Sequence, residues 1–196
     1  MKNAAAYGRR VLRGAPRAVF ALFQRLWRRI LVGVLALAVM FAAVTARVLV
    51  WPAQGMPSHV DAIVMMAGPG GREAVALRLA RERHAPVLVV SLGQHGYSGP
   101  CPAPVPGVRL ICFQPDPGNT RGEAEFTARL AVKYHWHSVV LVTTAEQDSR
   151  ARMLLRRCFG GEVYVVTAPQ PLSSVPGEIL YGWGALLKAL TLVRAC

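Results

Sequence analysis

The chain has 196 residues, of which 53% are hydrophobic, and a formal net charge of +13 at pH 7. This length is enough for one sizeable core and too short for two ordinary domains beside a membrane segment. Met1–Val50 contain nine basic residues and no acidic one, which leaves 14 Lys and Arg against ten Asp and Glu, a net charge of +4, for the rest. A nucleic-acid-binding domain would carry its basic surface on the folded part, so nucleic acid is excluded as the expected partner.

The first predicted element is a transmembrane helix at residues 30–50. Ile30–Ala46 carry no charge, and the apolar character continues past Arg47 to Trp51. About twenty such residues cross a hydrocarbon core if the arginine extends to the interface. Residues 1–29 then form a basic cytoplasmic tail, because positive flanks stay inside, and the domain that follows is extracytoplasmic. The chain is therefore predicted to be a single-pass protein of the cell membrane.

This amino-terminal segment has alternative interpretations. Val44-Thr45-Ala46 resembles the small-residue cleavage site of a removable export signal, although the apolar run continues beyond it. Residues 3–29 interleave arginines with apolar and aromatic side chains, as in helices that lie on anionic lipid. For residues 1–16 a solvated tail is the alternative. Membrane lipid is the partner that both the helix and the tail predict.

Residues 51–59 form a linker, and residues 60–196 form the extracytoplasmic α/β domain. Apolar runs without polar alternation, typical of strands buried on both faces, alternate there with segments of helical period. The expected strands are 62–67, 87–90, 108–113, 138–142 and 162–167, and the expected helices are 73–83, 120–134, 147–158 and one within 176–196. This alternation predicts a Rossmann-like, open and mainly parallel sheet of about five strands flanked by helices. Residues 94–107, rich in glycine and proline, are expected to form a loop in place of a crossover helix.

A glycine loop follows the first strand and leads into a helix. Gly68, Gly70 and Gly71 free the backbone to direct several N–H groups into one concavity, and the positive end of the helix favours an anion there. Arg72 could add a bidentate donor. The alternative is that the glycines only allow a tight turn between strand and helix.

Polar residues also follow the other strands, and open parallel sheets bind ligands beyond the carboxyl ends of their strands. The residues expected to gather there are Gly68, Gly70, Gly71, Arg72, Ser91, Gly93, Asn119, Thr120, Glu123, Thr143, Thr144, Gln147 and Arg150. With hydroxyls, amides, backbone donors, two arginines and few acids, the set suits a phosphate-bearing or otherwise anionic ligand. Arg72 and Arg150 are expected to converge on it. For Thr120 and Glu123, a capping box at the start of a helix is the structural alternative.

Metal and cofactor sites are not predicted. His135 and His137 point to opposite sides if extended, no Cys or carboxylate lies at a metal spacing near them, and they more simply end a helix. The sequence has no G-x-S-x-G for an acyl-transfer serine, and its glycine loop lacks the lysine of a P-loop. The apolar helix within 176–196 is too short to span a membrane, so it either covers the core or docks on the membrane.

Four cysteines in an extracytoplasmic domain are expected to meet an oxidising environment. Cys101 lies in the loop at 94–107 and Cys112 in the third strand, so a bridge between them would fold the loop over its own strand. Cys158 and Cys196 each end a helix, which makes a second bridge between them possible. The alternative is that Cys112 is a small buried apolar residue and Cys101 a free thiol.

Several short motifs stand in a defined order along the domain. They are Asp61-Ala62-Ile63-Val64 leading to Gly68 and Arg72, Ala85-Pro86 before a strand that ends Ser91-x-Gly93, Asn119-Thr120 opening a helix, and Val142-Thr143-Thr144 followed by Arg150-Ala151. Together they resemble the SanA/YdcF/ElyC family of bacterial envelope proteins, over about residues 60–166. The resemblance implies a Rossmann-like fold. Because membrane-anchored members are associated with envelope integrity, peptidoglycan assembly and lipid-carrier metabolism, it also implies an envelope-side domain that binds an anionic ligand.

The chain departs from the family pattern at two positions. Members usually show Asn-Thr-x-Glu-Asn, whereas Gly122 stands at the acidic position here and Glu123 follows it. Gln147 stands where a histidine is typical, and glutamine cannot exchange a proton near neutral pH. The expected function is therefore envelope-side binding of an anionic ligand rather than catalysis. An enzyme acting on a polyprenyl-phosphate- or nucleotide-linked precursor, or a membrane scaffold that recruits an unidentified protein, are the alternatives.

Overall fold

The structure is a computed structural model that describes residues 4–68, 70–94, 99–170, 175–193 and 196. The chain divides into two compact units, Met1–Val44 and Thr45–Cys196. The second unit contains the sheet and all the predicted ligand-binding residues, and the following description of the sheet concerns this unit alone.

The amino-terminal helix α1 spans Ala4–Thr45 and continues as a π-helical turn, η1, Ala46–Val50. Phe20–Val50 form a stretch of 31 residues that is long and apolar enough to cross a membrane. This stretch begins ten residues before the predicted span, because α1 runs without a break through the basic residues that precede it. From Ala4 onward the basic tail is helical.

Five parallel strands form one sheet in the order β3-β2-β1-β4-β5. They are β1 Ala62–Met65, β2 Val87–Ser91, β3 Arg109–Phe113, β4 Ser138–Thr143 and β5 Glu162–Thr167. Every neighbouring pair is parallel. The strand order reverses between β1 and β4, as in doubly wound folds. The predicted Rossmann-like α/β class is therefore confirmed.

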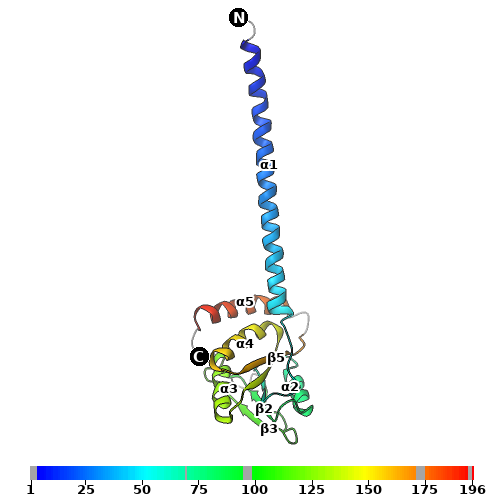
Figure 1. Ribbon diagram of the computed structural model, residues 1–196, viewed down its shortest axis with the longest axis vertical. Helices are drawn as coiled ribbons and strands as arrows, with labels where there is room; N and C mark the ends of the chain where they lie inside the picture. The colour runs from blue at the N-terminus through cyan, green and yellow to red at the C-terminus, as the bar shows by residue number, and fades with distance from the viewer. Residues whose placement is uncertain (1–3, 69, 95–98, 171–174, 194–195) are drawn as a thin grey trace. The chain divides into compact units, whose positions relative to one another are not determined.

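Helices cover both faces of the sheet (Figure 1). They are α2 Arg72–Arg81, α3 Thr120–Tyr134, α4 Ala145–Cys158 and α5 Val175–Thr191. On one face, Val64 and Leu141 of the sheet share a core with Leu155 of α4 and with small residues of α3. On the other, Ile63 and Val140 pack with α2. Successive side chains of each strand point to opposite faces of the sheet and therefore contribute to two separate cores. Both faces need apolar residues, which explains the uninterrupted apolar runs in the sequence.

The structure changes the predicted bounds of two helices. α2 ends at Arg81 rather than residue 83, because Arg83 adopts a left-handed conformation with φ 62°. α4 begins at Ala145 rather than residue 147, since the N–H groups of Gln147 and Asp148 already bond to the Thr144 carbonyl. His135 ends α3, as predicted, in a left-handed conformation with φ 56°.

The connection between β2 and β3 contains no α-helical residue in its described part, residues 92–94 and 99–108. A disulfide joins Cys101 in this connection to Cys112 in β3, with a Cα–Cα distance of 6.0 Å. A second disulfide joins Cys158, the last residue of α4, to Cys196, with a Cα–Cα distance of 5.0 Å. The disulfides thus attach the β2–β3 connection to β3 and the carboxyl-terminal residue to α4.

Candidate functional site

A cleft of about 1080 Å³ lies at the carboxyl end of the sheet. Its walls are the end of β1, the amino-terminal turns of α3 and α4, and one side of α5. β1 and β4 meet at the reversal of strand order, where doubly wound sheets bind their ligands. The cleft brings together seven of the thirteen predicted ligand-binding residues: Arg72, Gly93, Asn119, Thr120, Glu123, Gln147 and Arg150.

The other six predicted residues lie behind the cleft wall or in the glycine loop. They are Gly68, Gly70, Gly71, Ser91, Thr143 and Thr144. At Gly68 the backbone has φ +138°, and a Cβ would lie 2.2 Å from Nη1 of Arg72. Glycine is therefore required here both by the conformation and by the arginine that occupies the space above it.

Arg72 binds the ends of two strands together. Its side chain is 1% exposed. Nη1 donates to the carbonyl oxygens of Met66, at 3.4 Å, and Ala67, and Nη2 donates to Oγ1 of Thr144 at 2.8 Å. Met66 and Ala67 follow β1, and Thr144 follows β4, so the guanidinium bridges the reversal point of the sheet. Arg72 borders the cleft, but its hydrogen bonds to the protein make it first a structural residue.

Glu146 continues this hydrogen-bonded chain into the cleft. The Thr144 hydroxyl accepts from Arg72 and donates to Oε1 of Glu146. Glu146 is 4% exposed, and its Oε2 is buried without a hydrogen-bond partner among the described residues. The sequence did not indicate this residue, because an acid in the first turn of a helix is ordinarily explained by the helix dipole.

The start of α3 differs from the predicted capping box. Asn119 is the N-cap residue, and its Oδ1 accepts from the N–H groups of Arg121, at 2.9 Å, and Gly122, at 3.3 Å. Glu123 reaches away from its own helix, and its Oε1 accepts from the N–H of Ala67 at 2.6 Å. The capping-box alternative is therefore wrong, because the side chain of Asn119 caps the helix and the Glu123 carboxylate has its partner in the segment that follows β1.

Burial raises the pKa of Glu123 above its ordinary value of 4.5. The Ala67 N–H bond and the nearby Ser91 hydroxyl offset part of this rise, and so do the charges of Arg72 and Arg150. The last two effects indicate that both arginines lie near this carboxyl group. Both arginines border the same cleft, and the anion that they face in the protein itself is Glu123.

The raised pKa predicts a pH dependence of stability. Above pH 4.5 the unfolded chain releases the Glu123 proton before the folded domain does, so the free energy of unfolding falls as the pH rises through the folded pKa. Glu123→Gln retains an acceptor for the Ala67 N–H but has no carboxyl group, so the contribution of residue 123 to the pH dependence of the free energy of unfolding is absent. We expect the stability of the wild type relative to Glu123→Gln to decrease as the pH is raised above 4.5, measured by thermal unfolding in detergent. The exposed Glu73→Gln is the control, and an equal change with pH in both variants would contradict the prediction.

The structure explains why no acid stands at residue 122. A Cβ on Gly122 would lie 2.0 Å from the carbonyl oxygen of Pro117. The turn before α3 therefore passes too close to the helix for any side chain at this position. The nearest carboxylate in the cleft is carried one residue later, by Glu123.

Arg150 is an arginine of the cleft that no described residue engages by a hydrogen bond. Its guanidinium lies 5.6 Å from the ring centroid of Tyr181 on α5, and within the described part of the chain no hydrogen bond or ion pair engages it. The buried Nε, in particular, has no partner there. A half-buried cation with free donors requires an acceptor, and an anionic ligand would provide one.

The fourth wall, α5, supplies polar groups that the sequence did not indicate. They are Glu178, Tyr181 and Lys188. Together with the other walls the cleft has four basic residues, Arg72, Arg121, Arg150 and Lys188, and three acidic ones, Glu123, Glu146 and Glu178. The cleft therefore has more acids than the predicted set, because Glu146 and Glu178 come from positions whose direction depends on packing between helices.

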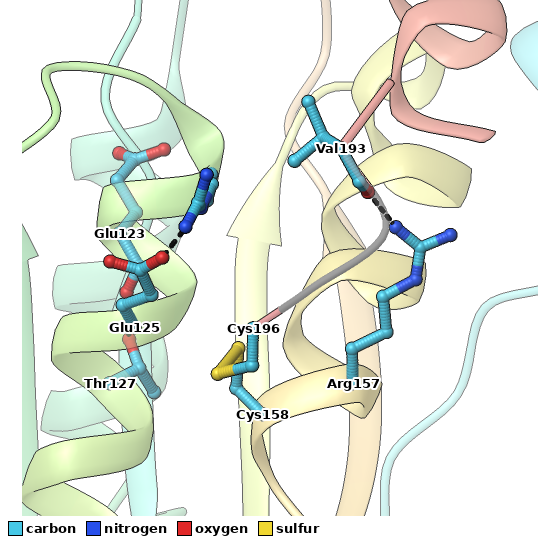
Figure 2. The surroundings of a disulfide bond; sticks show 8 residues. Glu123, Glu125, Thr127, Arg157, Cys158, Val193 and Cys196 are labelled. Carbon is cyan, nitrogen blue, oxygen red and sulfur yellow. Dashed lines mark hydrogen bonds and ion pairs between the residues drawn. A yellow bond between two sulfur atoms is a disulfide. The ribbon is translucent and has the colours of Figure 1, made fainter. Parts of the chain in front are cut away.

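Two contacts fasten the carboxyl end of α5 to α4 (Figure 2). Arg157 of α4 donates to the carbonyl oxygens of Ala189, at 3.0 Å, and Val193. The Cys158–Cys196 disulfide then ties the chain beyond α5 to the end of α4. The cleft wall is thus held by a covalent bond and by a charged donor to carbonyl groups at the carboxyl end of α5.

No cluster of three metal-ligating side chains occurs among the described residues. Comparison of the chain with models of protein families, with characterised proteins and with solved structures found no match.

Proposed function

We propose that this protein is anchored in the cell membrane by its amino-terminal helix and binds a phosphate-bearing ligand in the cleft of an extracytoplasmic domain. The observation that carries the proposal is Arg150, whose guanidinium borders the cleft and donates no hydrogen bond to any described residue. The start of α3 borders the same cleft and adds the partial positive charge of a helix amino terminus. A role in envelope biogenesis or integrity is supported by the motif order that resembles the SanA/YdcF/ElyC family.

The polar groups of the cleft narrow the class of ligand. Arg150 requires an acceptor, which a phosphate supplies in bidentate geometry. Glu146 Oε2 requires a donor, since it is a buried oxygen without a partner among the described residues. A phosphate ester that also carries hydroxyl groups, such as a phosphorylated sugar on a lipid or nucleotide carrier, would satisfy both.

Binding by the full chain in detergent tests the proposal. We expect saturable binding of farnesyl phosphate or of a nucleotide-linked sugar, measured by calorimetric titration. Arg150→Ala should weaken it by about 10- to 150-fold, because a hydrogen bond to a charged group contributes about 1.5–3 kcal/mol. Arg81→Ala is the matched control, since Arg81 is exposed on α2 and does not border the cleft. Equal affinity in the Arg150→Ala and Arg81→Ala proteins would contradict the proposal.

The orientation in the membrane follows from the basic residues before the span. Eight of them precede Ile30 and no acid does, so the amino terminus is expected inside and the domain outside. A reporter fused after Cys196 should be active on the extracytoplasmic side, and the mature protein should retain residues 1–46. Reporter activity confined to the cytoplasm would disprove the orientation, and an amino terminus at Arg47 would disprove the anchor.

Catalysis on such a precursor is the second candidate function. Glu123 favours it, because burial raises the pKa of this carboxyl group in the cleft, as is typical of side chains that transfer protons at active sites. Turnover of a polyprenyl-phosphate- or nucleotide-linked substrate that is lost in Glu123→Gln would favour the enzyme. If the cleft variants leave the cellular phenotype unchanged, a scaffold that recruits a protein is favoured instead.

A further inference from the structure

Helix α5 has an apolar stripe that the described residues leave uncovered. Its buried side, which faces α4, is made by Gly182, Leu186 and Ala189. A second stripe consists of Leu180, Leu187 and Leu190, with 78%, 61% and 49% of their surfaces exposed. Their spacing of seven and three residues places them along one side of the helix. We call these three residues the leucine stripe, and exposed apolar area of this kind marks an interaction surface.

The leucine stripe belongs to a helix that contacts the end of the candidate membrane span. η1 is the last turn of that span and packs against α4 and α5. Nε1 of Trp183 donates to Oγ1 of Thr45 at 3.2 Å, and Gly182 allows Leu49 to approach, since a Cβ there would lie 3.3 Å from the Leu49 side chain. α5 is thus held against the residues at which the chain would leave the hydrocarbon.

Side chains typical of a membrane interface occur at the same end of the span. Trp51 is 72% exposed, and its carbonyl accepts from the exposed Arg47 at 3.0 Å. Tryptophan and arginine at the end of a span lie at the level of the lipid headgroups. The charged residues of α5, Glu178 and Lys188, border the cleft instead of interrupting the leucine stripe.

We infer that α5 docks on the surface of the lipid bilayer through the leucine stripe, as an interfacial helix attached to the end of the span. The inference rests on the membrane anchor in the proposed function and adds a second contact with lipid. Lipid is the partner that we infer, because the last turn of the membrane span, η1, is in contact with α5. If the span lies in the bilayer, lipid is close to this helix. An amphipathic helix in that position buries its apolar side at the boundary of headgroups and acyl chains.

Spin labels on the full chain test the docking. The protein is reconstituted in vesicles of phosphatidylethanolamine and phosphatidylglycerol, with a label at Leu187→Cys. A label at Val132→Cys is the control, because Val132 is 76% exposed on α3. We expect the label at 187 to collide with oxygen, which dissolves in lipid, and to lose collisions with a water-soluble nickel complex. The label at 132 should collide with nickel. A label at Leu180→Cys should give the same result as the label at 187. Agreement between the two positions shows that the result does not come from a disturbance caused by one label.

The outcomes separate the docking from the anchor. If both labels collide equally with nickel while the protein floats with the vesicles after alkaline carbonate treatment, the docking is disproved and the anchor stands. A protein that carbonate releases from the vesicles disproves the anchor and the docking with it. Shielding of the label at 187 from both oxygen and nickel would mean that protein covers the leucine stripe, which also overturns the inference.

Discussion

Replacing Arg72 with methionine is expected to lower the free energy of unfolding by about 3–5 kcal/mol, the cost of removing one partner from a buried charged network. The variant leaves the carbonyl groups of Met66 and Ala67 without this donor and frees the hydroxyl of Thr144. It also removes a positive charge that faces the buried Glu123. Methionine fills most of the volume of the arginine side chain, so the decrease in the free energy of unfolding reports the lost polar contacts more than a new cavity.

Denaturant unfolding in detergent measures this effect. The matched control is Arg81→Met, which removes the same charge from an exposed position of the same helix and should change stability by less than about 0.5 kcal/mol. If the two variants unfold alike, the guanidinium does not hold the two strand ends together, and a primary role in ligand binding becomes the better explanation of Arg72.

Loss of the Cys158–Cys196 disulfide is expected to lower the free energy of unfolding by about 4 kcal/mol, on the chain-entropy model for a separation of 38 residues. The double variant Cys158→Ser/Cys196→Ser should also weaken binding in the cleft, because α5 is one of its walls. Titration of farnesyl phosphate after a check of folding by circular dichroism measures the second effect. In the wild type, thiol counting under denaturing, non-reducing conditions should find no free thiol.

The second disulfide provides the control. Cys101→Ser/Cys112→Ser opens a separation of only 11 residues, worth about 3 kcal/mol on the same model. Neither cysteine borders the cleft, so this variant should lose stability and keep its affinity. Equal loss of affinity in both double variants would show that binding follows global stability and not the position of α5.

Strand positions could be predicted because a parallel strand between two helical layers is apolar at successive positions and not only at alternate ones. Ile63 and Val64 face opposite cores, yet both are fully buried. The position of the cleft could be predicted from the same pattern, because the carboxyl ends of parallel strands lie together at one end of the sheet, where such folds bind ligands. For this reason seven predicted residues line the cleft.

Side-chain partners were less predictable, because they depend on where separate elements meet. Glu123 looked like a capping residue in sequence, but its carboxylate accepts from the N–H of Ala67, just after β1 and 56 positions earlier in the chain. Glu146 and Tyr181 enter the cleft only because α4 and α5 pack side by side. Arg72 was predicted as a donor to a ligand, and the sequence contained no indication that three protein oxygens would surround its guanidinium.

The close approach between Gly122 and the Pro117 carbonyl also restricts how this domain can evolve. A mutation from glycine to glutamate at 122 would place Cβ 2.0 Å from that oxygen, and the backbone on both sides of the contact belongs to the first turn of a helix and the loop before it. Acquisition of an acid at this position therefore requires the loop to change first. Residues 122 and 117 are therefore coupled. A single substitution at 122 would clash with the Pro117 carbonyl unless a second change moves the loop away from the helix.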